Sequence, residues 1–143
     1  MKPQVSFDGV RVGDQLPSLE RRPTAQQLVM YAGASGDYYQ IHYDPEFAQG
    51  QGLQGVVVHG ALKSAFLGQL VTDWIGLEGR LLELSARYRE MDTPNDVLTC
   101  RGVVTERWSE RGQHLVRCEL WIENGNGVRT TTGEALVSLP SWS

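Results

Sequence analysis

A long apolar segment constrains the fold of this chain more than any other feature of its sequence. Residues 60–74 carry a large apolar side chain at every fourth position, which is the spacing of one helix face, and small and apolar neighbours widen that face. The two sets are Leu62, Phe66, Leu70 and Trp74, and Ala61, Ala65, Leu67 and Val71. A helix that is apolar over so much of its circumference is buried. The sequence therefore predicts a central helix wrapped by other elements, most simply by a sheet.

The part of the chain after this segment alternates apolar and polar residues with a period of two, which is typical of strands. Strands are predicted at 81–89, about 97–107, 116–122 and 128 to about 139. The sequences DTPND, SERGQ and NGNG separate them, and the last marks a hairpin. One buried helix followed by four meandering antiparallel strands predicts an α+β domain with a sheet curled around the helix. Because such a sheet leaves an edge open, pairing with another copy or a related subunit is expected.

The part of the chain before the central helix is punctuated by glycine and predicts shorter helices. Thr24 and Gln27 have the spacing of a capping box, and the glycines between 33 and 36 end that helix. Pro45 follows Asp44 and opens a short second helix. The run QGVVVHG just before the central helix is strand-like.

Composition excludes several classes of function. The 143 residues fit one domain, 1–143, and the net charge of −4 with no basic stretch argues against nucleic-acid binding. The sequence shows no signal peptide and no apolar run long enough for a bilayer, so a cytoplasmic location is expected.

Cys100 and Cys118 lie in hydrophobic runs, which favours buried reduced thiols, with a disulfide between them as the alternative.

The sequence SGDYYQIHYD at 35–44 concentrates ionisable side chains in a loop. Asp37 and His42 lie five residues apart between Gly36 and Pro45, so both side chains can face one spot. A carboxylate and an imidazole facing one cavity supply an acid and a base near neutral pH. The plainer interpretation is that Asp37 caps the following turn and His42 hydrogen-bonds a carbonyl group.

His59 and Gly60 stand at the amino end of the central helix. The first N–H groups of a helix have no internal partner, and the helix dipole favours negative charge there. Such groups can hold an oxygen that gains charge during a reaction, and Gly60 has no side chain to block a ligand. The plainer interpretation is that Gly60 only begins the helix and His59 packs against strands.

Other kinds of site are weaker alternatives. His42 and His59 with Asp37 or Asp44 offer two imidazoles and one carboxylate to a metal, but no His-x-x-x-His spacing occurs and the cysteines are distant in the chain. The sequence lacks a phosphate-binding glycine loop, a dinucleotide fingerprint and a Gly-x-Ser-x-Gly elbow. We therefore expect neither a metal nor a cofactor.

Two stretches together resemble a known family. The run YAGASGDYYQIHYDPEFA and the later run GVVVHGALKSAF are similar to MaoC-like dehydratases, which include (R)-specific enoyl-CoA hydratases and bacterial 3-hydroxyacyl-carrier-protein dehydratases. The likeness extends from VRVGDQLPSLERR through the PND turn to the last strand. It implies a hot-dog fold, in which a curved antiparallel sheet wraps one long helix, usually as a dimer.

The resemblance also implies an activity, which is the reversible addition of water to a 2-enoyl thioester of CoA or an acyl-carrier protein. Asp37 and His42 match the catalytic acid and histidine, and the Gly60 N–H matches the group that polarises the thioester carbonyl. Tyr39 and Gln40 replace the Asn and Pro common in the family motif, so they and His59 become candidates for the substrate pocket. Which of Asp37 and His42 is the acid stays open, as do the acyl group and its carrier.

Two other functions stay open at this point. The chain is alternatively an auxiliary or non-catalytic subunit of a heteromeric dehydratase, which need not keep the Asp37–His42 pair. It is alternatively a hot-dog acyl-CoA thioesterase, which would direct water at the carbonyl carbon instead of at C3.

Overall fold

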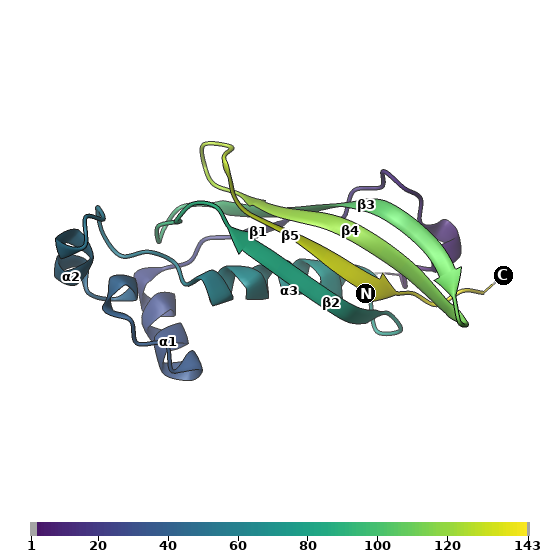
Figure 1. The fold of residues 1–143 in the computed structure, drawn as a ribbon, viewed down its shortest axis with the longest axis horizontal. Coiled ribbons are helices and arrows are strands. Elements are labelled where there is room, and N and C mark those ends of the chain that lie inside the picture. The colour runs from purple at the N-terminus through teal and green to yellow at the C-terminus, as the bar shows by residue number, and fades with distance from the viewer. Residues whose placement is uncertain (1–2, 143) are drawn as a thin grey trace.

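The computed structural model describes residues 3–142, and Figure 1 shows a curved sheet lying along one side of a long helix. The helices are α1 (Ala25–Ser35), α2 (Pro45–Gly50) and α3 (Gly60–Ile75), with short 3-10 turns η1 (Phe7–Gly9) and η2 (Gln40–His42). The strands are β1 (Leu19–Arg21), β2 (Arg80–Tyr88), β3 (Leu98–Glu110), β4 (Gln113–Glu123) and β5 (Arg129–Ser138). All pair antiparallel in the order β1-β3-β4-β5-β2.

The helix boundaries follow the local capping signals of the sequence. The Thr24 hydroxyl accepts a hydrogen bond from the Gln27 amide at 3.1 Å, and α1 ends where Gly36 adopts φ 77°. The Asp44 carboxylate accepts from the first amides of α2, and Pro45 stands at its start. The predicted start of each helix is therefore confirmed.

The predicted meander is confirmed for β3, β4 and β5, which are neighbours in chain order, and it is wrong for β2. The strand β2 pairs with β5 instead of β3, and the short strand β1, which was not predicted, pairs with the other edge of β3. The chain between β2 and β3 does not fold back as a hairpin, because its backbone forms hydrogen bonds with other parts of the molecule. The Glu90 carbonyl accepts from Lys63 of α3, and the Asn95 amide donates to the Pro23 carbonyl.

The strand-like run at 54–60 forms no strand. The Val57 amide donates to the Ile41 carbonyl, and the Val58 amide donates to the Asp92 carbonyl. The backbone of this segment is therefore satisfied by two separate loops, which leaves it extended between them. The predicted end of the second strand is also corrected, since β3 continues to Glu110 and turns at Arg111 and Gly112, both with positive φ.

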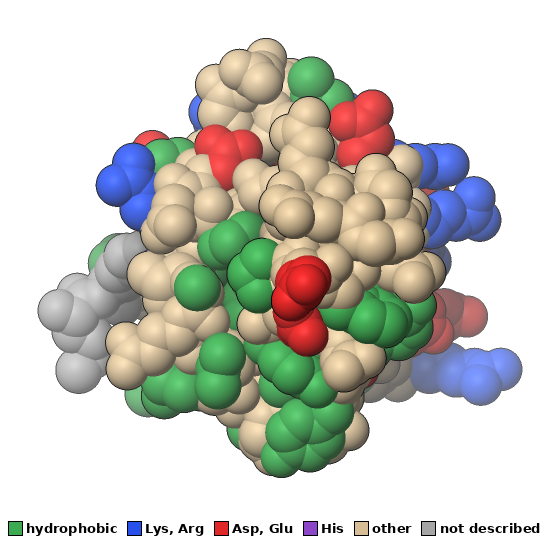
Figure 2. Space-filling view, turned by 90° about the vertical axis from the view of Figure 1, so that its left-hand side faces the viewer, with side chains coloured by type: hydrophobic (Ala, Val, Ile, Leu, Met, Phe, Trp, Pro, Cys, Tyr) green, Lys and Arg blue, Asp and Glu red, His purple; other side chains and the backbone are tan. Residues whose placement is uncertain are grey.

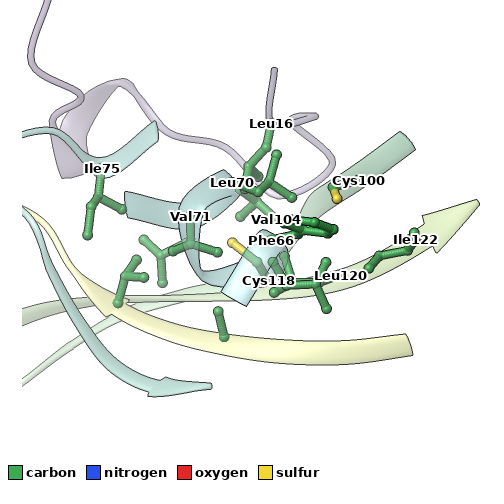
Figure 3. Packing of buried hydrophobic residues seen from close by; sticks show 14 of the residues in the cluster. Leu16, Phe66, Leu70, Val71, Ile75, Cys100, Val104, Cys118, Leu120 and Ile122 are labelled. Carbon is green, nitrogen blue, oxygen red and sulfur yellow. The ribbon is translucent and has the colours of Figure 1, made fainter. Parts of the chain in front are cut away.

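The core lies between α3 and the sheet, and Figure 3 shows side chains of one cluster from both, among them Phe66, Leu70 and Val71 of α3 and Val104 and Leu120 of the sheet. Each fully buried side chain of this kind contributes about 1.5–3 kcal/mol relative to exposure. The predicted burial of the central helix is confirmed.

The two cysteines of this core are free thiols, so the alternative of a disulfide is not realised. Burial raises the pKa of both Cys100 and Cys118 to about 12, which keeps them protonated.

None of the helices within residues 3–142 is long and apolar enough to cross a membrane.

Candidate active site

The loop between α1 and α2 lies at the amino end of α3, the end of the molecule where both shorter helices sit (Figure 1). Gly36 turns the chain out of α1, and η2 then carries His42 inward. Asp37, His42 and His59 meet there, with one ligand atom of each within 4.8 Å of the others. The structure thus brings together three of the six residues that the sequence singled out.

His42 is buried, and its ring is held by the main chain. The Nδ1 atom lies 2.8 Å from the Val57 carbonyl oxygen, which can only accept, so a neutral ring carries its proton on Nδ1. The Nε2 atom is then an unprotonated acceptor. It lies 3.9 Å from Oδ2 of Asp37, which is too long for a direct hydrogen bond. Both atoms therefore remain able to bind the same water molecule.

The two carboxylate oxygens of Asp37 have different surroundings. Oδ1 accepts a hydrogen bond from the Tyr39 amide at 3.3 Å and so fixes the turn, while Oδ2 faces His42. The Asp37 side chain is 49% exposed, so a solute can reach its carboxylate. The plainer interpretations of Asp37 and His42 both hold, and they orient the two groups toward each other.

His59 is buried behind His42. The two rings stack with centroids 3.8 Å apart and planes 19° apart, and Tyr31 meets His59 edge-on at 4.8 Å. Neither ring nitrogen of His59 has a hydrogen-bond partner within residues 3–142. Burial lowers the pKa of His59, and the neighbouring His42 lowers it further, while the backbone and carboxylate of Asp37 act in the opposite direction. His59 therefore favours the neutral form.

A consequence for stability follows from the lowered pKa of His59. Below its ordinary value of 6.5 the unfolded chain takes up a proton that the folded protein resists, so acid favours unfolding. We expect this part of the stability to be complete above about pH 6.5 and to be lost as the pH falls through the folded pKa. The His59→Phe variant keeps a ring between Tyr31 and His42, and we expect its unfolding free energy in urea to fall less from about pH 7 to about pH 5 than that of the wild type. Equal losses in the two proteins would contradict this.

Gly60 is the first residue of α3 and shares a cavity of about 280 Å³ with His42. The N-cap residue His59 makes no side-chain hydrogen bond to this helix end, and amides at a helix start without a cap can bind a ligand. A Cβ atom on Gly60 would lie 2.9 Å from the Tyr88 ring, so the close approach of that ring requires glycine. The cavity is lined by Ile41, His42, Val57, Val58, Gly60, Lys63, Tyr88, Arg89, Glu90 and Met91.

The other pocket candidates lie outside the wall of this cavity. Tyr39 is 53% exposed, with its ring 6.3 Å from His42 and 6.0 Å from Phe47. Gln40 is exposed, and its carbonyl accepts from the amides of Tyr43 and Asp44. The roles of Tyr39, Gln40 and His59 toward a substrate stay predictions.

The cluster offers a metal three ligands, but its geometry does not suit one. Imidazole lone pairs lie in the plane of the ring, and a zinc ion needs each nitrogen at about 2.0–2.1 Å. Two stacked rings in nearly parallel planes cannot both direct a lone pair at one such point unless one ring rotates. The Asp44 carboxylate, the alternative ligand, instead accepts from the first amides of α2. The arrangement suits proton transfer better than metal binding.

The sequence did not single out Lys63, which lines the cavity, or its partner Asp92. Both are buried, and Lys63 Nζ donates to Oδ2 of Asp92 at 3.0 Å. The signal was present, because Lys63 precedes Phe66 and Leu67 by three and four positions and so lies on the apolar face of the predicted helix. Tyr88 and Met91 were also missed, since nothing in the sequence places the end of β2 beside the start of α3.

Figure 2 views the end of the molecule that carries α1 and α2. Apolar side chains gather over the lower half of this face around an acidic side chain, and basic ones lie only at its margins. No histidine of the described residues reaches this surface, in line with the burial of His42 and His59.

Comparison with known proteins gives one matching family and several similar sequences. The family model described as MaoC like domain matches residues 10–131. The (R)-specific enoyl-CoA hydratase of Aeromonas caviae is 26% identical over 137 residues, which cover 95% of this chain and 100% of that protein. The Fatty acid synthase subunit beta of Gibberella zeae is 43% identical over 53 residues, and that of Saccharomyces cerevisiae is 29% identical over 112 residues. The matched parts are only 3% and 5% of those two proteins.

Solved structures show the same architecture. The (R)-hydratase from A. caviae involved in PHA biosynthesis superimposes with a TM-score of 0.81 at 28% identity, covering 92% of this chain and 98% of that one. A chain of the ChsH1-ChsH2 complex from Mycobacterium tuberculosis gives a TM-score of 0.80 at 24% identity, covering 90% and 98%, and this likeness concerns the fold. The predicted α+β hot-dog fold, a curved antiparallel sheet around one long helix, is confirmed.

Proposed function

Because the chain belongs to the MaoC-like domain family, a family of enoyl-CoA hydratases and dehydratases, we propose that it catalyses the reversible hydration of a 2-enoyl thioester to the (R)-3-hydroxyacyl thioester. One observation carries this proposal. The Nδ1 atom of His42 is bound to a carbonyl group, so its Nε2 faces the Asp37 carboxylate as a free acceptor. The substrate is an acyl thioester of CoA or of a carrier protein.

The pair Asp37–His42 activates water in this proposal. Water is a poor nucleophile, so His42 Nε2 removes one proton as the oxygen attacks C3, and the Asp37 carboxylate orients the same water. The electron pair of the double bond moves through C2 to the thioester oxygen. C2 then takes a proton from the Asp37–His42 pair, so that one hydrogen and one hydroxyl have been added. The reverse sequence of steps is dehydration.

The amino end of α3 stabilises the charge that develops on the thioester oxygen. The Gly60 N–H lies at an uncapped helix start, where the dipole favours a negative oxygen. Gly60 and His42 line one cavity, so a thioester bound at Gly60 is within the same cavity as the proposed base. Side chains and the helix end supply every step, and no cofactor enters the mechanism.

The whole chain, 1–143, acts as one domain in this proposal and pairs through the edge strand β2. Among residues 3–142 this strand has one neighbour in the sheet, and it exposes Leu82, Leu84 and Tyr88. An open strand edge with apolar side chains favours a second chain as its cover. We propose a second copy or a related hot-dog subunit as the partner.

A role as an auxiliary subunit is the second candidate. The observation that favours it is Tyr39, a large and half-exposed ring at the position where the resemblance leads us to expect asparagine. In this case a related subunit performs the chemistry, and this chain binds the thioester or stabilises its partner.

A spectroscopic assay separates the candidates. The purified protein is incubated with crotonyl-CoA and longer 2-enoyl-CoA esters, and the enoyl absorbance and free thiol are followed together. A hydratase removes the absorbance without releasing CoA, and this is the result we expect. Release of free CoA indicates a thioesterase. No change with any chain length, alone, favours the auxiliary subunit.

A further inference from the structure

The buried ion pair Lys63–Asp92 lies close to the proposed catalytic residue His42 and is connected to it through one peptide group. Both side chains are almost fully buried, and Lys63 Nζ donates to Asp92 Oδ2 at 3.0 Å and to the Glu90 carbonyl at 3.2 Å. The Thr130 hydroxyl donates to the same Asp92 oxygen at 2.6 Å. The Thr130 carbonyl also accepts hydrogen bonds from the amides of Arg89 and Glu90. Residues 89–92 are therefore held by both α3 and β5.

This pair is hard to explain as a device for stability. A lysine in the first turn of a helix opposes the helix dipole, and removing two charges from water is costly. Well-packed apolar residues of similar volume often serve a fold as well or better. Its place beside the cavity suggests a role in geometry instead, since Lys63 and Glu90 both line the cavity that holds His42.

A single peptide group connects the pair to His42. The amide of Val58 donates to the Asp92 carbonyl at 2.8 Å, and the carbonyl of Val57 accepts from His42 Nδ1 at 2.8 Å. These two groups belong to the same planar peptide unit, which cannot twist internally. The position of Asp92 therefore sets the direction of the Val57 carbonyl, and that carbonyl sets the tautomer and the orientation of the His42 ring.

We propose that Lys63, Asp92 and Thr130 form a positioning network that holds the Val57–Val58 peptide so that Nε2 of His42 stays unprotonated and faces Asp37. The expected effect of this network on kcat rests on the proposed function, whereas its expected effect on the His42 tautomer does not. Lys63 and Asp92 are positioning residues here, since they act through the peptide group.

The experiment replaces both charges at once, as Lys63→Met with Asp92→Asn, because removing one alone leaves the other buried and unpaired. The matched control is Arg101→Met with Glu123→Gln, which breaks an ion pair of 3.3 Å on the sheet far along the chain from the loop. The chain has three histidines, so long-range nitrogen NMR can assign each ring. We expect the Nδ1–H tautomer of His42 in the wild type and in the control, and a mixture of tautomers in the double variant.

We expect kcat of the double variant to fall about ten- to hundredfold with KM nearly unchanged, since small displacements of a reacting group cost rate of this order. A double variant with the wild-type His42 tautomer and kcat overturns the proposal. A loss of kcat that only follows the folded fraction, with the tautomer retained, overturns it as well. If the wild type hydrates no enoyl thioester, the proposed function fails, and the tautomer alone decides this proposal.

Thr130 supplies a milder test should the double variant not fold. Thr130→Val removes the hydroxyl at nearly constant shape, and Thr130→Ser keeps it. We expect Thr130→Val to shift the His42 tautomer and lower kcat, and Thr130→Ser to restore both. Equal behaviour of the two variants overturns the proposal.

Discussion

The His42→Ala variant is expected to lose at least about a hundredfold in the rate of enoyl-thioester hydration. In the proposed mechanism His42 Nε2 takes the proton from water, and alanine offers no acceptor at this position. His59, the adjacent imidazole, is buried and has a lowered pKa, so it is a weaker base than an ordinary histidine. The measurement is kcat on the best enoyl-CoA ester.

The control for this variant is His114→Ala, which removes a partly exposed histidine that contacts Phe7 and Ser109. We expect the control to keep the wild-type rate. Circular dichroism and urea unfolding check that His42→Ala remains folded. A folded His42→Ala protein with a near-normal rate would remove His42 from the mechanism.

The Asp37→Asn variant is expected to show a loss of similar size, at least about a hundredfold. The amide oxygen of asparagine still accepts from the Tyr39 amide, so the turn that positions residue 37 is kept. The change removes the negative charge that faces His42 and the oxygen that orients water. The measurement is kcat and KM together, with a loss expected in kcat.

Asp44→Asn is the matched control for that variant. It makes the same chemical change in the same loop, but Asp44 caps α2, and asparagine is an equally good cap. We expect its rate to equal that of the wild type. Equal losses in the two variants would mean that Asp37 acts through the structure of the loop.

The sequence predicted the elements of the fold better than their order. Periodicity is local, so it located the central helix and the strands β2 to β5 to within a few residues, but not the short strand β1. Strand order depends on contacts between distant segments, and the prediction of a meander failed at the segment 89–97. That segment is held by Lys63 and Pro23, and neither contact leaves a trace in local periodicity.

The candidate site, too, could be predicted from the sequence only in part. Asp37, His42 and Gly60 were found because a polar loop and a helix start are visible as patterns, and the resemblance gave them roles. The orientation of His42 depends on the Val57 carbonyl, fifteen residues away, and the support of that carbonyl depends on Asp92 and Lys63. A lysine on the apolar face of the predicted central helix was the visible sign of this network.

The most direct test of the central claim is to follow the oxygen of water. The protein is incubated with an enoyl-CoA ester in water enriched in oxygen-18, and the products are analysed by mass spectrometry. The account predicts that the label enters the hydroxyl at C3 of an intact 3-hydroxyacyl thioester, and that His42→Ala and Asp37→Asn both abolish it. Label in a released carboxylate, or none in any product of the wild-type protein, would contradict the account.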